Sequence, residues 1–496
     1  MKSLVDWNKE IVFASSDSDV SHQISRLVKQ GRLRKIALRL YTTNMMDSPE
    51  SIVKRNILSI LNWRFPNTVI SHRSACEMRI TSAGTFYLTG NYNRKVTDLP
   101  GVTIYMLKGP VADSKDMAYG KMYIASEYRW MLENMQASRK QGDESKTLPI
   151  GVIERKLESV LVAGGEEQLN QYRDALRATA ERLGMEAEFA KINVLISALL
   201  NTHSAQVLSE PSAKAAAAGY PYDEQRLELF EKLYDELQRQ HLLSRPVAVQ
   251  TEIDYQNIAF FESYFSNYIE GTEFAVDEAR KIVDTGVAMP TRAEDSHDIL
   301  GTFHVVSNRM EMSVCPTSSQ ELCEILCRRH AILLEGRPAM NPGHFKEKNN
   351  RAGNTEFVEM SRVRGTLDAG FGYYAALTSP IARAIYMMFL ISEVHPFQDG
   401  NGRMARIMMN AELFRAGEAK IIVPTVYRED YLLVLRKLSR EGIAAPYIKV
   451  MNHLHHFTST LYGKDFQELL HYLTECNAFE TPDRGKLMFG KWKTEN

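Results

Sequence analysis

The chain has 496 residues, more than one hydrophobic core usually organises, so we expect two or three domains. Its 60 lysines and arginines balance 61 aspartates and glutamates, which excludes a molecule-wide polyanion-binding surface and leaves local basic patches open. No apolar stretch reaches the length of a membrane span and the first residues lack a secretory signal, so we expect a cytoplasmic protein without a membrane partner.

A basic segment near the amino terminus predicts a nucleic-acid contact. Residues 21–41 contain no aspartate or glutamate, but they contain six cationic side chains: Arg26, Lys29, Arg32, Arg34, Lys35 and Arg39. The pattern favours a helix over residues 20–30, a stop at Gly31 and then an alternating strand, the order of a recognition helix and a wing. Such basic residues would contact DNA phosphates, with a salt-sensitive affinity. A small module used only for protein contacts is the alternative.

This segment, together with SHRSA at residues 71–75, resembles the winged-helix domain of abortive-infection antitoxins and related bacterial regulators. The resemblance implies a winged-helix or α+β region over residues 1–110, with DNA as its partner. Apolar side chains alternate at Val102, Ile104 and Met106, which indicates that strands complete this region.

Residues 111–245 predict a helical connector. Apolar side chains recur at helical spacing from about residue 148 to residue 203, and Gly184 interrupts the pattern. The segment SEPSAKAAAAG, residues 209–219, is rich in small side chains and is the best linker candidate. A helix over residues 223–240 then leads into the last region.

The last region, residues 246–496, contains the stretch that carries most of the chemistry. Residues His395–Arg406 read HPFQDGNGRMAR. We expect a buried helix through residues 381–391 before this stretch and a second helix from Arg403 to about residue 416. The positive amino-terminal end of the second helix would point into the glycine-rich turn, where it stabilises an anion. The stretch therefore predicts a phosphate-binding loop.

Each polar residue of this loop suits a nucleotide phosphate. A neutral His395 can take a proton from an incoming hydroxyl, because histidine titrates nearest neutrality. Asp399 suits Mg²⁺, which prefers carboxylate, phosphate and water oxygens. The residues expected to contact phosphates are Gly400, Asn401, Gly402, Arg403 and Arg406. A surface turn with a solvated charge cluster is the alternative.

The stretch resembles the signature of the Fic family, H-x-F-x-[D/E]-G-N-G-R-x-x-R, and matches each of its fixed positions. The resemblance covers roughly residues 255–460 and implies a mostly helical core. It also implies transfer of AMP from ATP to a serine, threonine or tyrosine hydroxyl of a target protein. By this resemblance, His395 is the general base, Phe397 anchors the loop and Asp399 holds Mg²⁺. The two glycines and the asparagine between them would form the anion hole, with the two arginines on the phosphates.

A second motif lies earlier in the same region. Residues 265–274 read FSNYIEGTEF, in which Ser266-x-x-x-Glu270-Gly271 resembles the inhibitory [S/T]-x-x-x-E-[G/N] motif of Fic proteins. A helical carboxylate aimed at the anion hole would pair with Arg406 and occupy the guanidinium that the γ-phosphate needs. In the alternative interpretation, Gly271 is only a helix C-cap. In some relatives this glutamate also positions water for removal of AMP, so the reverse reaction stays open.

Residues 346–358, rich in asparagine, glycine and alternating side chains, favour a β-hairpin. In Fic proteins a flap at this place pairs with an extended target segment by strand addition, which sets the acceptor hydroxyl against the base. An ordinary connecting loop is the alternative.

The whole sequence predicts a mainly α protein: an all-helical Fic core with a β-hairpin flap, preceded by a winged-helix or α+β region and a helical connector. We expect an autoinhibited AMP-transferase that uses ATP and Mg²⁺ and modifies a hydroxyl of a target protein or of itself. The alternatives are a DNA-binding regulator, transcriptional or of the toxin–antitoxin type, whose Fic core senses nucleotide, and a Fic enzyme that removes AMP. The intact His395 argues against the sensor, because sensing a phosphate needs no base. A homodimer stays open.

Overall fold

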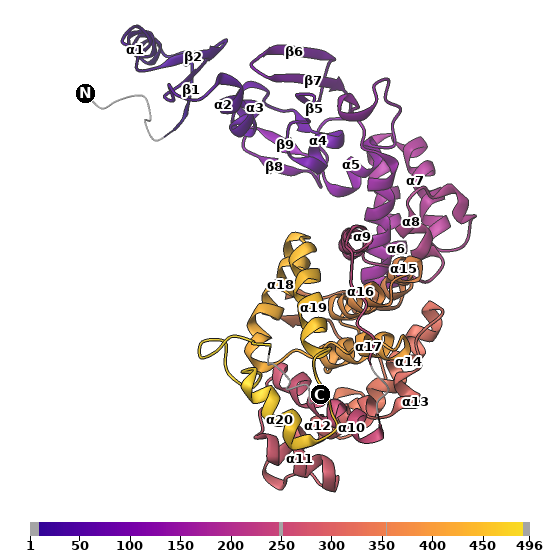
Figure 1. The fold of residues 1–496 in the computed structure, drawn as a ribbon. Coiled ribbons are helices and arrows are strands. Elements are labelled where there is room, and N and C mark those ends of the chain that lie inside the picture. The colour runs from indigo at the N-terminus through magenta and orange to yellow at the C-terminus, as the bar shows by residue number, and fades with distance from the viewer. Residues whose placement is uncertain (1–8, 248–250, 354, 490–496) are drawn as a thin grey trace. The chain divides into compact units, whose positions relative to one another are not determined.

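A computed structural model describes three stretches of the chain: residues 9–247, 251–353 and 355–489 (Figure 1). The chain divides into two compact units, Met1–Ala218 and Gly219–Asn496. The finer division into three regions, with boundaries near residues 110 and 245, stays a prediction. Asn354, within the predicted hairpin, and the first eight residues, considered above for a secretory signal, lie outside the described residues.

The first unit combines two sheets with several helices (Figure 1). Its strands are β1 (Ile11–Phe13), β2 (Arg34–Ala37), β3 (Leu40–Thr42), β4 (Val69–Ile70), β5 (Thr85–Gly90), β6 (Arg94–Leu99), β7 (Val102–Lys108), β8 (Met117–Tyr119) and β9 (Met122–Ile124). Its helices are α1 (Ser18–Lys29), α2 (Pro49–Arg55), α3 (Ile57–Arg64), α4 (His72–Glu77), α5 (Glu127–Glu133), α6 (Ile150–Leu183), α7 (Glu186–Leu199) and α8 (Pro211–Ala217).

Helix α1 and strands β1 to β3 form a small amino-terminal module. The antiparallel strands have the order β1-β3-β2, and Asp17 caps α1 by accepting hydrogen bonds from the backbone N–H groups of Asp19 and Val20. The apolar cluster of the module contains Val12, Ile24, Leu27 and Leu33. Between β1 and β2 the described residues contain α1 but no second helix of a helix-turn-helix, so the winged-helix assignment stays a prediction.

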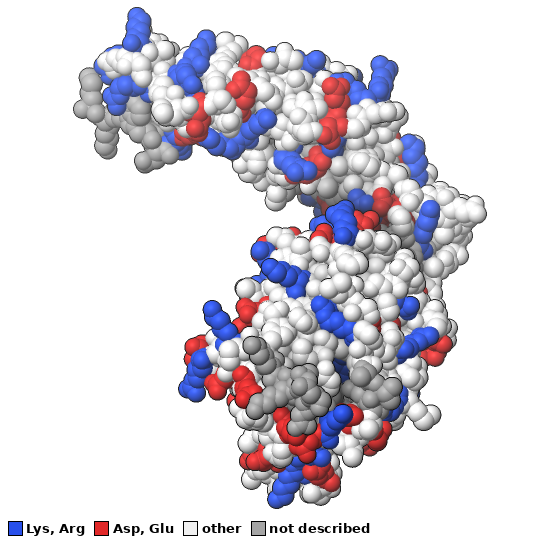
Figure 2. Space-filling view, in the orientation of Figure 1, with Lys and Arg blue, Asp and Glu red and all other residues white. Residues whose placement is uncertain are grey.

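Lysine and arginine side chains stand over α1 and β2 in Figure 2. Arg34 is half-buried and donates to the Asp47 carbonyl. The exposed cationic side chains of the module are Arg26, Lys29, Arg32, Lys35 and Arg39. They belong to α1, to the turn that follows it and to the β2–β3 hairpin.

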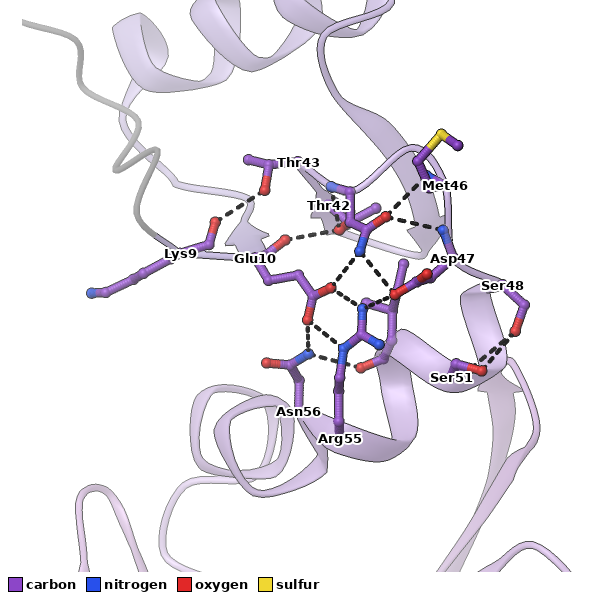
Figure 3. Close-up of polar contacts among 12 residues, drawn as sticks. Lys9, Glu10, Thr42, Thr43, Met46, Asp47, Ser48, Ser51, Arg55 and Asn56 are labelled. Carbon is purple, nitrogen blue, oxygen red and sulfur yellow. Dashed lines mark hydrogen bonds and ion pairs between the residues drawn. The ribbon is translucent and has the colours of Figure 1, made fainter.

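A polar cluster ties the amino-terminal module to helix α2 (Figure 3). The Glu10 carboxylate, next to β1, accepts hydrogen bonds from Arg55 (Nε–Oε2, 2.8 Å), Asn56 (2.6 Å) and Asn44 (2.9 Å). The hydrogen bond from Arg55 holds the pKa of Glu10 at about 2, well below its usual value, with smaller contributions from the two asparagines. Arg55 also donates to the Asp47 carboxylate (2.5 Å). The cluster therefore orients the module through charge-assisted hydrogen bonds.

A six-stranded sheet forms the body of the first unit, in the order β6-β7-β5-β4-β9-β8. Strands β5 and β7 run parallel, as do β4 and β9, and the other neighbours are antiparallel. The strand-rich part thus extends beyond residue 110, to Ile124. The SHRSA segment follows β4, where the buried Glu133 carboxylate accepts from the His72 N–H across 2.8 Å.

The predicted connector, residues 111–245, begins with strands β8 and β9 and is helical only from α5 onward. Helix α6 ends at Gly184, which has a left-handed φ of 66°. The boundary between the two compact units lies within the predicted linker at residues 209–219, between Ala218 and Gly219, but most of that segment is helix α8 and not a flexible tether. There Ala213 and Ala217 are buried, and the Glu154 carboxylate accepts from the backbone N–H groups at the start of the segment. Alanine favours helices, and its small side chain allows close packing, so this composition produced a packed helix instead of a flexible tether.

The second unit is built of helices with one small hairpin, which confirms the mainly α prediction. Its helices are α9 (Glu224–Arg239), α10 (Glu252–Ile269), α11 (Val276–Thr285), α12 (Ala293–Val306), α13 (Arg309–Met312), α14 (Ser319–Leu333), α15 (Val363–Ala376), α16 (Pro380–Val394), α17 (Asn401–Arg415), α18 (Arg428–Glu441), α19 (Ala445–Thr458) and α20 (Phe466–Glu475). Its strands are β10 (Arg351–Ala352) and β11 (Thr355–Glu356). None of the helices in the described stretches is long and apolar enough to cross a membrane.

Helices α16 and α17 pack along each other at the centre of the second unit, where the sequence predicted two helices. Ser379 caps the start of α16 and Pro380 occupies its first turn, as the sequence indicated. Most side chains of both helices are buried, including Ile385, Phe389 and Met408. The loop between the two helices is therefore held by a rigid core on both sides.

Candidate active site

The loop between α16 and α17 changes the chain direction at two residues with left-handed backbone angles. His395 ends α16 with a φ of 53°, and its N–H donates to the Ile391 carbonyl across 2.9 Å. Gly400, with a φ of 74°, precedes the first residue of α17, and none of the described side chains caps this helix start. The backbone N–H groups of the first turn of α17 are thus available to an anion.

The side chain of Asn401 closes the loop on itself. Its Oδ1 accepts from the Phe397 N–H, and its Nδ2 donates to the Phe397 carbonyl, both across 2.8 Å. The sequence placed Asn401 against the attacked phosphate. In the structure the side-chain amide of Asn401 forms its hydrogen bonds with the backbone of the loop. The group that Asn401 can donate to an anion is therefore its backbone N–H.

Phe397 is buried under the loop and stacks on His330 of α14 (ring centroids 3.8 Å apart), and its role as the loop anchor stays a prediction. His330 Nδ1 accepts from the Gly343 N–H (2.9 Å), so Nε2 carries the proton and donates to the Asp399 carbonyl (3.1 Å). Burial lowers the pKa of His330 to about 4. Sequence reasoning missed this supporting histidine, because nothing in its local pattern relates it to the loop.

The imidazole of His395 is oriented by a stack and a hydrogen bond. Its ring lies on Phe357, with centroids 3.6 Å apart and planes 6° apart. Nδ1 lies 3.3 Å from the Ser392 carbonyl, which can only accept, so Nδ1 carries the proton and Nε2 is left as an acceptor. Burial lowers the pKa of His395 to about 4, although the hydrogen bond to Ser392 opposes this change. The side chain is therefore a neutral base at pH 7.

Arg406 is held by both ends of the second motif. Its Nε donates to Ser266 Oγ (2.9 Å), and its Nη2 donates to the Ser266 carbonyl (2.8 Å) and to Glu270 Oε1 (2.6 Å). A Cβ on Gly402 would lie 2.2 Å from Glu270 Oε1, so this carboxylate stands over the first turn of α17. Glu270 is the C-cap of α10, and Gly271 follows with a φ of 94°. Gly271 thus ends the helix, and the Glu270 carboxylate also contacts Arg406, so the two interpretations of the motif do not exclude each other.

Arg403 has a different environment from Arg406. Its buried guanidinium forms an ion pair with Asp298 of α12 (2.7 Å) and lies 3.7 Å from the Asp399 carboxylate. Sequence reasoning placed both arginines next to one anion. The described lining of the cavity includes Arg406 and not Arg403, so a phosphate contact by Arg403 stays a prediction.

A cavity of about 460 Å³ opens over the loop. Its lining comes from the end of α10, the start of α17, the end of α16, the hairpin and helix α18: Glu270, Ala352, Gly353, Thr355, Phe357, Ser392, Glu393, His395, Gly402, Arg406, Tyr431, Leu432, Leu435, Arg436, Ser439 and Arg440. The predicted hairpin is present, with Arg351 paired to Glu356, although its strands are short. The segment before the hairpin is hydrogen-bonded to the loop between α16 and α17, because the Lys346 N–H donates to the Pro396 carbonyl (2.9 Å).

Asp399 fits a magnesium ion that is shared with a phosphate. Its side chain is 42 % exposed, and Oδ1 accepts from the Gly400 N–H across 2.7 Å. The described residues contain no group of three or more metal-ligating side chains, so substrate phosphate and water oxygens would have to supply the other ligands. That donor set is common for Mg²⁺.

Comparison with known proteins places this loop in a recognised domain. Residues 321–413, which include most of α14 and α17 and all of α16, match the Fic/DOC family. The protein named Protein adenylyltransferase Fic from Culex quinquefasciatus is 25% identical over 257 residues, which are 50% of this chain and 50% of that protein. The protein of the same name from Drosophila willistoni is 27% identical over 199 residues, 38% of this chain and 39% of that protein.

The chain therefore spans half or less of the length of these curated relatives. Among solved structures, Fic-1 (aa134–508) from C. elegans matches with 16% identity and a TM-score of 0.36, covering 65% of this chain and 92% of that one.

Proposed function

We propose that this Fic-domain protein is an autoinhibited protein adenylyltransferase, which transfers AMP from ATP to a serine, threonine or tyrosine hydroxyl of a target protein or of itself. One observation carries the proposal: a neutral base and an anion-binding helix start line one cavity. His395, whose Nε2 is left as an acceptor, lines this cavity together with Gly402 in the first turn of α17 and the guanidinium of Arg406. The match to proteins named adenylyltransferase supports the reaction class.

In the proposed reaction, the target oxygen attacks the α-phosphorus of ATP while its proton passes to His395 Nε2. The bond from the α-phosphorus to the bridging oxygen breaks, and pyrophosphate leaves in line with the attacking oxygen. The backbone N–H groups of Gly402 and its neighbours stabilise the charge that develops on the α-phosphate. Arg406 neutralises the distal phosphates. A Mg²⁺ ion at Asp399 would supply further charge neutralisation when ATP is bound.

Autoinhibition follows from the position of Glu270. Its carboxylate occupies the Arg406 guanidinium and stands against Gly402, where a phosphate would have to bind. A phosphate and a carboxylate in that space would repel each other, so ATP would bind loosely or in a non-productive pose until Glu270 moves. A Fic enzyme that uses Glu270 to position water and remove AMP is the alternative within the same site.

The hairpin is proposed to present the target. Strands β10 and β11 line the cavity, and Phe357, just after β11, lies on the base. An extended target segment that added to this hairpin as a strand would have its hydroxyl beside His395.

The amino-terminal module supports a second proposed function, DNA binding. Its five exposed lysines and arginines lie on α1, on the turn that follows it and on the adjoining hairpin, an arrangement suited to phosphate contacts along a duplex. A regulator that binds DNA and uses the Fic domain only as a nucleotide sensor is the alternative to the enzyme. The neutral His395 favours the enzyme, because a sensor needs no base.

The reaction class is tested with ATP labelled in either the α- or the γ-phosphate, added with Mg²⁺ to the Glu270→Gly variant and a cell lysate. Transfer of AMP puts the α-label into protein and leaves the γ-label in pyrophosphate. Protein-bound γ-label would indicate phosphoryl transfer. Absence of both labels, with nucleotide binding intact, would favour the sensor.

A further inference from the structure

The polar restraint on the ring of His395 is weak. Its Nδ1 lies 3.3 Å from the Ser392 carbonyl, just beyond the usual range of a hydrogen bond between nitrogen and oxygen. The stack on Phe357 is closer, with ring centroids 3.6 Å apart and planes 6° apart. The plane of the imidazole, and with it the direction of Nε2, therefore depends mainly on where the Phe357 ring lies.

Phe357 lies opposite Asn350 at the base of the hairpin. Its N–H donates to the Asn350 carbonyl across 3.3 Å, one pair beyond Arg351 and Glu356. Val358, the next residue, is buried in the core of the second unit. The position of Phe357 is therefore set by the burial of Val358 and by the backbone of Asn350.

The side chain of Asn350 connects this hairpin to the loop that carries His395. Its Nδ2 donates to the carbonyl of Phe397 across 2.9 Å, and the same carbonyl accepts from Asn401 Nδ2 across 2.8 Å. Its Oδ1 accepts from Lys346 Nζ across 2.7 Å. An amide can donate and accept at once, whereas an aspartate of the same size can only accept.

A backbone contact runs beside this side-chain contact. The Lys346 N–H donates to the Pro396 carbonyl, and Pro396 and Phe397 are the two residues that follow His395. The Lys346 side chain is buried, and burial lowers its pKa to about 8. Asn350 thus binds a costly buried ammonium group with one atom and the loop with another.

We propose that Asn350 is a positioning residue, which holds the hairpin against the loop so that the Phe357 ring keeps the His395 imidazole oriented for proton transfer. This role rests on the proposed function, because it assumes that His395 is the base. The contacts run from the loop carbonyl of Phe397 to Asn350, to Phe357 and then to His395. Transfer of a proton is sensitive to such orientation, because donor and acceptor must be within hydrogen-bond reach and aligned.

The first test follows the His395 ring by nuclear magnetic resonance, using the full chain with ¹³C-labelled histidine. A ring stacked on a phenylalanine has its signal displaced by the ring current, and the His395 signal is identified by its loss in His395→Ala. Both Asn350→Ala and Phe357→Leu should move the signal toward the position of an unstacked histidine. A signal that stays in place in Asn350→Ala would overturn the proposal. This measurement needs neither ATP nor turnover.

Asn349→Ala is the matched control. It removes the neighbouring amide, whose Oδ1 accepts from the Met360 N–H across 2.9 Å. The His395 signal should not move in this variant, and a displacement equal to that of Asn350→Ala would overturn a specific role of Asn350. The signals of the buried His330 and His455 show whether each variant is folded.

The second test measures AMP labelling in the Glu270→Gly background. Asn350→Ala should lower kcat by about tenfold to a hundredfold while KM for ATP stays unchanged, because the base is misaligned and the phosphate contacts remain. Asn350→Asp keeps the acceptor for Lys346 but cannot donate to the Phe397 carbonyl, so it should lose a similar factor. Full activity in Asn350→Asp would show that the bridge to the loop is not needed and would overturn the proposal.

A double variant tests whether Asn350 acts through Phe357. If it does, Asn350→Ala combined with Phe357→Leu should be no slower than the slower single variant. Losses that multiply would show two independent effects and would contradict the proposed route. Absence of labelling already in Glu270→Gly would contradict the proposed function instead, and the His395 signal would still test whether Asn350 sets the stack.

Discussion

The Arg406 guanidinium lies 2.6 Å from the Glu270 carboxylate, across the space between α17 and the end of α10. Ser266, four residues before Glu270, accepts from the same guanidinium through Oγ and its carbonyl, so one turn of α10 holds three of its hydrogen bonds. Burial alone would lower the pKa of Arg406, but the charge and hydrogen bond of Glu270 together with the interaction with Tyr431 outweigh burial and raise this pKa above the ordinary value. The contact therefore stabilises a charge that would otherwise be costly to bury.

Asn401 is expected to stabilise the loop as well as the site. Asn401→Ala would leave the N–H of buried Phe397 without its acceptor, at about 1–3 kcal/mol, while the Phe397 carbonyl would keep the hydrogen bond from Asn350 Nδ2. We expect a lower denaturant midpoint for the second unit and a large loss of labelling. Asn401→Asp keeps the acceptor but loses the donor, so its effect should be smaller. Unfolding followed by circular dichroism measures the midpoints of both variants, and an unchanged midpoint for Asn401→Ala would refute the loop-closing role.

Arg226 is expected to hold the flap. It donates to the Glu356 carbonyl on β11 while its ion pair with Glu393 fixes it to α16. Arg226→Ala should therefore increase hydrogen–deuterium exchange in peptides that cover residues 351–357, by severalfold, and lower target labelling. Arg226→Lys keeps the charge but not the forked geometry, so intermediate exchange is expected. Exchange that does not change in either variant would show that the flap is held by other contacts.

The pH dependence of labelling should follow His395. The neutral imidazole is the active form, and burial places its pKa at about 4 instead of 6.5, so protonation inactivates the base only near pH 4. Lys346 also lowers this pKa, whereas Glu270 and Asp399 raise it. Initial rates in the Glu270→Gly variant at saturating ATP should stay level from about pH 8 to pH 5 and fall below that. A decline centred near pH 6.5 would contradict a buried, neutral base.

The basic face of the amino-terminal module predicts salt-dependent DNA binding. Reversing two exposed charges, Lys29→Glu and Lys35→Glu, should weaken binding to duplex DNA and reduce the slope of log affinity against log salt by about one for each phosphate that the variant no longer neutralises. Fluorescence anisotropy of the full chain between 50 and 300 mM salt, roughly the range over which such interactions weaken, measures both quantities. Lys214→Glu on α8, outside this module, is the matched control. An affinity insensitive to salt or to both reversals would favour a protein-contact module.

Much of the site could be predicted because its signals are local. The apolar run before His395 and the glycines after it predicted two helices and a turn, an inference from helical periodicity and turn chemistry, which act over a few residues. The carboxylate near Arg406 was predicted from the resemblance of Ser266-x-x-x-Glu270-Gly271 to the inhibitory motif. The contact between Glu270 and Arg406 is present in the structure, while the inhibitory role of Glu270 stays a proposal.

The remaining features depend on distant parts of the chain. His330 supports the loop from α14, and Asp298 pairs with Arg403 from α12, yet neither has a pattern that relates it to the loop. The helix α8 within the predicted linker has the same origin, because the burial of α8 depends on Glu154 and on neighbouring helices. Composition reports what a segment can do alone, whereas tertiary contacts decide whether it packs.

The most direct test of the proposed function measures AMP incorporation from α-labelled ATP with Mg²⁺ in three proteins: the unaltered chain, Glu270→Gly, and Glu270→Gly combined with His395→Ala. Loss of the carboxylate frees Arg406 and the space over Gly402, so Glu270→Gly should label protein at least about tenfold faster, a factor that corresponds to roughly one charge-assisted hydrogen bond. The added His395→Ala should abolish the label. Equal labelling by the first two proteins, or label that survives without His395, would contradict an autoinhibited transferase with His395 as its base.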